Sequence, residues 1–331
     1  MKLFIDSVFS KYYSEYPIVL IDVGASGGLE PNWKSAVRYL KIIGFEPGKK
    51  EFSELTKKES SNVKYLNSAL YNKKTTLDFY LMKDQQVSSI IKPNRRLLDK
   101  FPEIERFDAV GKTKIETDTL DNLFDIHSFD EPDFIKLDTQ GTELSILQGA
   151  VDTLRDHIFG IEVEVEFVEI YESQPLFSEV DSFIRKQGFQ LFDLQRFYWK
   201  RKIGKDFHKK KGQLIFGNAL YLRESEDFKR VIDNIQDGVV KKCKVLKAVS
   251  ICLLYGYFDY AMEVLVMTEK LFDITEYKAI EKRIKRSVRF ESKIPHFKGK
   301  RFLADILGSI MEIVKPSYNG WASTDRKLGN L

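Results

Sequence analysis

The sequence predicts an α/β fold with a Rossmann-like, largely parallel sheet that carries helices on both faces. Short apolar runs alternate with stretches of helical period between residues 17 and 195, the pattern of βαβ units. A glycine turn at Gly24, Gly27 and Gly28 follows the first run, and an acid, Glu46, ends the second. Such a turn and such an acid are typical of a sheet that binds an adenosine-bearing cofactor at its carboxyl edge.

The elements follow from apolar runs, helical periods and turn residues along the chain. The expected strands are 18–22, a run ending at Glu46, 63–67, 75–82, 134–138, 160–167, and a closing antiparallel pair at 189–194 and 213–222. The expected helices are 49–58, 142–154, about 178–188, and two joined near Gly256. Residues 84–116 are expected to form a long lid or binding loop, residues 196–212 a basic loop, and residues 316–331 a polar tail.

The 331 residues divide by this pattern into three parts. We expect an N-terminal helix at 1–16, a catalytic domain at 17–224 and a helical C-terminal region at 225–331. Charge follows a similar division, since residues 1–195 hold 24 Lys+Arg against 33 Asp+Glu, whereas residues 196–331 hold 29 against 16. The basic part therefore favours contact with an anionic partner such as a glycan, a nucleotide-linked sugar, a nucleic acid or a membrane surface.

Composition also restricts the cellular setting. Cys243 and Cys252 are nine residues apart in a helical stretch, so they are expected as buried thiols on opposite helix faces. No apolar run has the ~18 residues needed to span a membrane. Asp6 interrupts the apolar start of the chain, which is not typical of a signal peptide. A cytoplasmic protein is expected, with its oligomeric state left open.

The glycine turn distinguishes between two cofactors. Nicotinamide dinucleotides use G-x-G-x-x-G to approach a pyrophosphate, but here Ser26 stands two residues after Gly24. S-adenosylmethionine (SAM) has no pyrophosphate, and its sulfonium and amino-acid end suit an acid such as Asp22. Glu46 would accept hydrogen bonds from both ribose hydroxyls. The predicted cofactor is therefore SAM, bound at Asp22, at the glycine turn (Gly24, Gly27) and at Glu46 and Pro47.

Charged residues on two central strands form the candidate catalytic cluster. Glu162, Glu164 and Glu166 alternate with apolar residues and share one strand face, as do Lys136 and Asp138 on the preceding strand. In one interpretation Lys136 or Glu164 is a general base for a substrate hydroxyl. In a second, Asp138 and Glu164 hold Mg²⁺, which lowers the pKa of that hydroxyl. In a third, Lys136 and a glutamate form a buried ion pair that only fixes strand register.

The chain resembles the FkbM family of SAM-dependent methyltransferases. The resemblance covers roughly residues 17–222 and is carried by Ile21-Asp22-Val23-Gly24-Ala25, Gly44-Phe45-Glu46-Pro47, Ser88-Ser89, Thr117-Asp118-Thr119-Leu120-Asp121, the run from Pro132 through Lys136-Leu137-Asp138-Thr139-Gln140-Gly141 to Glu143, Gly149-Ala150, Glu164-Val165-Glu166-Phe167, the run 171–177 beginning at Tyr171, and Gly188-Phe189. It implies a class I methyltransferase fold that methylates an oxygen, commonly of a sugar or a secondary metabolite. It also implies that Asp22, Gly24, Ser26 and Glu46 face SAM, with Ser68 and Ala69 near the adenine. The region after about Ser225 lies outside the shared pattern.

The sequence is compatible with three functions. The first is an O-methyltransferase acting on a hydroxyl of a sugar, a polysaccharide precursor or a glycosylated metabolite. The second is an RNA methyltransferase that uses the basic loop at 196–212 and the C-terminal helices to hold phosphates, since residues 196–202 interleave aromatic and basic side chains as single-strand binders do. The third is a non-catalytic scaffold with a methyltransferase-like fold. The acceptor, the hydroxyl and the need for a metal are not determined by the sequence.

Overall fold

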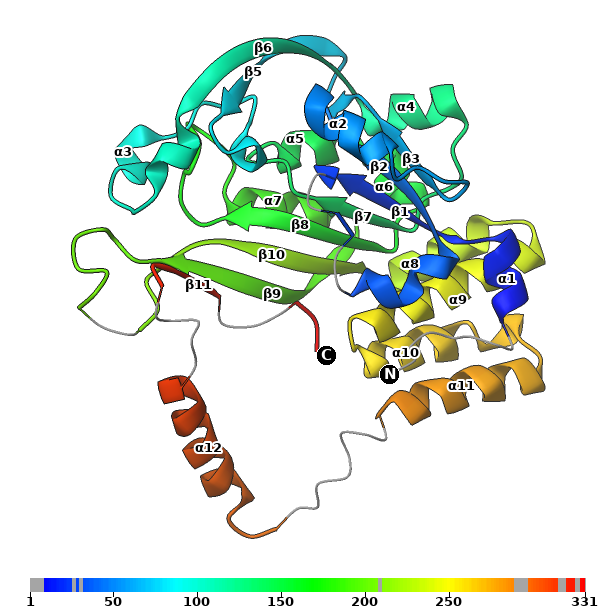
Figure 1. The fold of residues 1–331 in the computed structure, drawn as a ribbon. Coiled ribbons are helices and arrows are strands. Elements are labelled where there is room, and N and C mark those ends of the chain that lie inside the picture. The colour runs from blue at the N-terminus through cyan, green and yellow to red at the C-terminus, as the bar shows by residue number, and fades with distance from the viewer. Residues whose placement is uncertain are drawn as a thin grey trace.

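An eight-stranded sheet forms the centre of the part of the chain that the computed structural model describes, residues 9–25, 28–29, 32–207, 210–288, 297–314, 320–324 and 328–330 (Figure 1). Its strand order is β11-β9-β10-β8-β7-β1-β2-β3. The strands are β1 (Ile18–Val23), β2 (Leu40–Phe45), β3 (Val63–Leu66), β7 (Phe134–Leu137), β8 (Gly160–Glu166), β9 (Phe189–Trp199), β10 (Gln213–Arg223) and β11 (Ala322–Thr324).

The central strands are parallel and buried on both faces, as the fold prediction requires. β1 pairs in parallel with β2 and with β7, and β7 pairs in parallel with β8. All six residues of β1 are buried, which explains its lack of hydrophobic alternation. β10 lies between β8 and β9 and is antiparallel to both, so the expected closing pair is confirmed. The Rossmann-like α/β prediction is therefore correct.

Helices from different parts of the chain cover the two faces of the sheet (Figure 1). One face carries α4 (Leu120–His127), α5 (Glu143–Gln148), α6 (Val151–Asp156) and α7 (Phe177–Lys186). The other carries α1 (Ser10–Glu15), η2 (Trp33–Tyr39), α8 (Ser225–Asn234), α9 (Gly238–Leu254), α10 (Phe258–Met267) and α11 (Ile274–Val288). α2 (Lys49–Thr56) lies beside β3, η5 (Glu269–Leu271) precedes α11, and α12 (Lys300–Val314) follows it. The helices α8 to α11 thus complete the core on that face of the sheet.

A second, three-stranded sheet stands over the carboxyl edge of the first. It has the order β4-β6-β5, with β4 (Ala69–Leu70), β5 (Thr75–Met82) and β6 (Ala109–Asp118). Short turns of helix, η3 (Gln85–Val87), α3 (Arg95–Leu98) and η4 (Ile104–Phe107), connect β5 to β6. The expected long loop at 84–116 is therefore wrong from Ala109 onward, where backbone pairing with β5 forms a strand.

Three other expectations are corrected by the structure. The helix expected at 142–154 is divided into α5 and α6, because the backbone at Gly149 and Ala150 leaves the helical conformation. Position 149 has no room for a side chain, since a Cβ there would stand 2.1 Å from the carbonyl oxygen of Tyr71. The basic loop begins only after Trp199, because β9 continues through Arg196–Trp199 in register with β10. The tail is not wholly irregular, since β11 adds an antiparallel edge strand beside β9.

A buried ionic cluster attaches α9 to the start of β7. Asp133 accepts from Lys244 Nζ at 2.8 Å, from Lys247 Nζ at 2.9 Å and from the backbone N–H of Val19 at 2.9 Å. Burial alone would raise the pKa of Asp133, but the two lysines outweigh it and hold that pKa below its usual value. The C-terminal helices are thereby joined to the sheet by charge as well as by apolar packing.

Candidate active site

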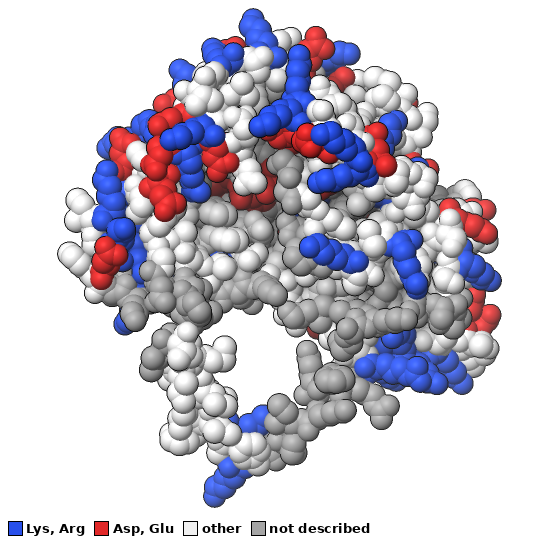
Figure 2. All heavy atoms as spheres, in the orientation of Figure 1, with Lys and Arg blue, Asp and Glu red and all other residues white. Residues whose placement is uncertain are grey.

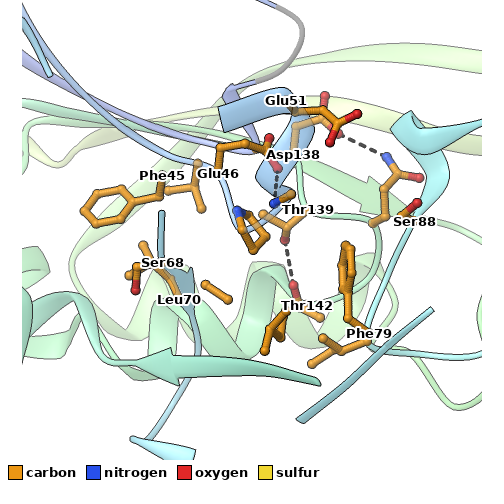
Figure 3. A pocket seen from close by; sticks show the side chains of 18 of the residues that line it. Phe45, Glu46, Glu51, Ser68, Leu70, Phe79, Ser88, Asp138, Thr139 and Thr142 are labelled. Carbon is orange, nitrogen blue, oxygen red and sulfur yellow. Dashed lines mark hydrogen bonds between the residues drawn. The ribbon is translucent and has the colours of Figure 1, made fainter. Parts of the chain in front are cut away.

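A pocket opens between the carboxyl ends of β1, β2 and β7 and the second sheet, with a volume of about 800 Å³ out to its mouth. Glu46 and Asp138 lie at its upper side, with Ser68 and Leu70 on one flank and Phe79 and Ser88 on the other (Figure 3). Its size and its position at the carboxyl edge of the parallel strands are those of a ligand site in this class of sheet.

Gly24 makes the close approach of strand ends at this pocket possible. Its φ is +79°, and a Cβ there would stand 1.9 Å from the carbonyl oxygen of Asp138. Its N–H donates to the carbonyl of Phe45 at 3.1 Å, and the N–H of Asp138 donates to the carbonyl of Val23, also at 3.1 Å. Backbone hydrogen bonds thus join the turn after β1 to the ends of β2 and β7, and the backbone at Gly24 is not covered by a side chain of its own.

Glu46 follows the last residue of β2 and is buried in the pocket wall. Its Oε1 accepts from the N–H of Gly48 at 2.8 Å. Burial raises the pKa of Glu46 to about 7; the Gly48 bond lowers it, and nearby Glu51 raises it further. A carboxylate held this way gains from a ligand that donates hydrogen bonds to it, as vicinal ribose hydroxyls do.

Pro47, Ser68 and Ala69 also line the pocket, as does Gly24. Ser26 and Gly27 lie outside the residues that the structure describes. Asp22 lies directly before the lining residues Val23 and Gly24, but its carboxylate turns to the interior. Its Oδ1 is 3.8 Å from the Nζ of Lys136. The structure therefore brings most of the predicted cofactor residues together and places Asp22 beneath them.

Lys136 occupies a buried row of charges inside the sheet. Register places it beside Asp22 on β1 and beside Glu162 on β8. Glu162 accepts from the hydroxyl of Tyr255 at 2.7 Å, and that hydroxyl accepts from Trp33 Nε1 at 3.0 Å. Lys136 is not a lining residue of the pocket. Its geometry is that of a buried ion pair within the sheet.

Gln140 connects the other two members of the predicted catalytic cluster. Its Nε2 donates to Asp138 Oδ1 at 3.1 Å and to Glu164 Oε1 at 3.0 Å. Its Oε1 lies 3.0 Å from the hydroxyl of Tyr171, which also lies 2.9 Å from the carbonyl of Val87. Asp138 and Gln140 line the pocket, and Glu164 lies next to them on β8. The structure thus places Asp138 and Glu164 on either side of one amide.

The loop that carries Gln140 is held by a buried acid. Glu143 accepts from the N–H of Thr139 at 2.8 Å, from its hydroxyl at 3.0 Å and from the N–H of Gly141 at 3.0 Å. Gln140 has φ +63°, a conformation that costs energy for a residue other than glycine. Glu143 offsets that cost by binding both neighbours of Gln140. Glu143, five residues after Asp138, therefore holds the loop in the conformation that directs the side chain of Gln140 toward Asp138 and Glu164.

Burial raises the pKa of Glu164 well above its usual value, and Asp138, Glu166 and Glu143 raise it further by charge repulsion, while Lys136 lowers it. Burial likewise raises the pKa of Glu166. Within the described residues, only Gln140 hydrogen-bonds to Glu164, and it uses Oε1. Glu164 keeps part of its surface exposed. The carboxylate of Glu164 therefore binds a proton more tightly than a free one, and its Oε2 makes no hydrogen bond within the described residues.

Some site residues are not predicted individually by the sequence. Gln140 and Glu143 belong to the segment after Lys136 that carries the family resemblance, but the sequence assigns neither of them a role. Tyr171 is likewise marked only by that resemblance. The polar run Thr139–Thr142 directly after a buried strand is the available signal for Gln140. The lining residues Phe79, Gln86 and Ile115 come from the second sheet and its connections, where no motif marks them.

The predicted metal site does not gain support from the geometry. Across the described segments no group of three or more His, Cys, Asp or Glu side chains is arranged to hold a metal ion. An amide NH₂, which donates hydrogen bonds and does not ligate cations, stands between Asp138 and Glu164. The two carboxylates are accordingly assigned no Mg²⁺.

The fold and site define a class I methyltransferase: five parallel strands, β3-β2-β1-β7-β8, are followed by the antiparallel pair, with the pocket at their carboxyl edge. The family model described as Methyltransferase FkbM domain matches residues 22–191. The chain belongs to the FkbM methyltransferase family.

Solved structures similar to this chain include two methyltransferases. Methyltransferase FkbM from Methylobacillus flagellatus KT is 15% identical with a TM-score of 0.37, and the match covers 62% of this chain and 43% of that one. Precorrin-6y C5,15-methyltransferase from Geobacter metallireducens GS-15 is 10% identical with a TM-score of 0.33, and the match covers 66% and 88%. The chain thus spans less than half of that FkbM structure. No curated protein sequence matched it.

Proposed function

We propose that this protein is a SAM-dependent O-methyltransferase that acts on a hydroxyl of a sugar, a polysaccharide precursor or a glycosylated metabolite. One observation carries the proposal: the pocket that is lined by the buried carboxylate of Glu46 is also lined by Asp138 and Gln140, and Gln140 hydrogen-bonds to Glu164. The cytoplasmic location and the three-part division of the chain stay predictions.

The pocket suits SAM by its chemistry. Glu46 offers two carboxylate oxygens to ribose hydroxyls, and the open backbone at Gly24 admits the amino-acid end. Phe79, Leu70 and Ile146 offer apolar surface to an adenine. Bound SAM would supply an electrophilic methyl group on a sulfonium. Asp22 would position the turn at Gly24 and not contact SAM itself, because its carboxylate pairs with Lys136 inside the sheet.

Glu164 is assigned the role of general base. The acceptor oxygen would bond to the methyl carbon as the carbon–sulfur bond breaks, and the hydroxyl proton would pass to Glu164 Oε2. Gln140 orients the carboxylate through Oε1, and Asp138 on the other side of that amide keeps the pKa of Glu164 high by repulsion. A carboxyl with a raised pKa is the better base for a hydroxyl.

The RNA alternative loses one of the features that motivated it, the aromatic side chains of the basic segment. Tyr198 and Trp199 are buried in β9, and the ring of Phe197 stacks on Phe216 with 4.5 Å between centroids. These rings are therefore occupied by the sheet and do not form a stacking platform for bases. The scaffold alternative gives no account of the buried, mutually repelling acids beside the pocket, which cost stability without a catalytic use.

Incubation with methyl-labelled SAM and three acceptor classes tests the proposal. Nucleotide-linked sugars and oligosaccharides are expected to become labelled, and structured or single-stranded RNA is not. Label in RNA alone would establish the alternative. Binding of SAM with no transfer to any class, while Glu164→Gln leaves all measured properties unchanged, would favour the scaffold.

A further inference from the structure

The helix α12 presents a broad apolar face that is open to solvent. Its large apolar residues recur at helical spacing: Phe302, Leu303, Ile306, Leu307, Ile310, Met311 and Val314. At about 100° per residue they occupy half of the helix circumference. Each is between 40% and 72% exposed. Arg301, Asp305 and Ser309 lie outside this half of the helix.

A patch of this kind calls for a partner. Elsewhere in the described chain the exposed large apolar residues, such as Val37, Val110 and Ile126, are scattered, whereas seven of them are contiguous on α12. Soluble proteins rarely expose such a patch unless it binds something. The described helices include none that is long and apolar enough to cross a membrane. α12 therefore suits a surface location.

The charge around α12 favours an anionic partner. Residues 278–315 hold 11 Lys+Arg and 4 Asp+Glu. On α11 the exposed basic residues include Lys278, Lys282, Lys285 and Arg286. In Figure 2 blue side chains gather over α11 and at the end of the molecule where α12 begins, while α12 itself is largely white. A broad apolar face flanked by cations is the pattern of a helix that lies in the interface of an anionic membrane.

We propose that α12, together with the basic part of α11, docks this protein on an anionic lipid bilayer, with α12 in the plane of the membrane and its apolar face inserted. A second copy of the chain fits less well, because two such segments would carry like charge. The apolar half-circumference is also wider than the narrow seam of a helix pair. A nucleic acid would satisfy the charge but leave the apolar face exposed. This inference does not depend on the proposed acceptor.

Two neighbouring substitutions separate insertion from charge. Ile310→Glu and Ser309→Glu change the net charge equally, but only the first places a carboxylate on the apolar face. Flotation of the full chain with vesicles of phosphatidylcholine containing phosphatidylglycerol measures the partition coefficient. Ile310→Glu should lower it at least about tenfold, since one aliphatic side chain no longer inserts. Ser309→Glu should lower it by no more than about fivefold, the contribution of one charge.

Neutral phosphatidylcholine vesicles should bind at least about a hundredfold more weakly, because several cations lose their attraction. Phe302→Trp supplies a second readout, a blue shift of indole fluorescence when anionic vesicles are added. Equal losses in the two glutamate variants, or no binding of wild type to anionic vesicles, would overturn the proposal. A wild-type dimer that Ile310→Glu dissociates, without vesicle binding, would assign the face to a second copy. Unchanged thermal unfolding in both variants excludes misfolding.

Discussion

Replacement of Glu164 by glutamine tests the assigned base. Glutamine keeps the shape of the side chain and can still accept from Gln140 Nε2, so the 3.0 Å hydrogen bond is retained. Only the ability to take a proton is lost. General base catalysis contributes typically 10²–10⁴-fold, so kcat should fall at least about a hundredfold while SAM affinity holds. Removal of a charge that repels Asp138 and Glu166 should leave the fold at least as stable near neutral pH.

The pH dependence of the same reaction is an independent test of Glu164 as the base. Glu164 accepts a proton only when ionised, and burial with repulsion from Asp138 raises its pKa well above the usual value. Wild-type kcat should therefore rise with pH through that raised pKa, and the rise should be absent in Glu164→Gln. Glu169→Gln, an exposed acid just after β8, is the matched control and should behave as wild type. If Glu164→Gln turns over within threefold of wild type, roughly the scatter of such comparisons, the assignment fails.

Three further results are expected from the same contacts. SAM affinity should fall about tenfold between pH 8 and pH 6, because the pKa of Glu46 is about 7 and the ionised fraction declines below it; a flat profile would contradict the ribose contact. Asp133→Asn should lower the free energy of unfolding by about 3–5 kcal/mol, since two buried lysines lose their counter-charge. In the wild type this contribution to stability is present at neutral pH and should be lost as pH falls through the lowered pKa of Asp133. Urea unfolding of the variant that matches wild type would refute this prediction. Lys136→Met should likewise destabilise the fold by about 3–5 kcal/mol because Asp22 loses its partner, whereas a hundredfold loss of kcat at unchanged stability would make Lys136 catalytic.

The parallel core of this protein is predictable from the sequence because its signal is local. Apolar β-branched runs such as β1 are buried on both faces, and turn residues separate them. The closing antiparallel pair is predictable for the same reason. Its length is not, because Arg196 and Lys200 make the end of β9 resemble a solvated loop, whereas pairing with β10 and β11 decides the conformation there.

The second sheet and the catalytic loop depend on contacts distant in sequence. β6 is a strand because β5 pairs with it, and its own burial pattern is weak. Likewise, Glu143 is buried because it binds the N–H groups of Thr139 and Gly141, a role that composition does not reveal. Alternating acids on β8 do predict the face shared by Glu162, Glu164 and Glu166. Which of them contacts the pocket-lining Gln140 depends on tertiary structure, and it is Glu164.

Calorimetric titration of SAM into wild type and Glu46→Ala tests the central claim most directly. We expect that SAM binds wild type, that NAD does not, and that Glu46→Ala weakens SAM binding about a hundredfold or more. Two charge-assisted hydrogen bonds of roughly 1.5 to 3 kcal/mol each would be lost. The nearby Glu51→Ala variant, which removes a more exposed acid from the pocket rim, should bind SAM at least as well as wild type. Equal SAM affinity in wild type and Glu46→Ala would contradict the assignment of this pocket to the cofactor.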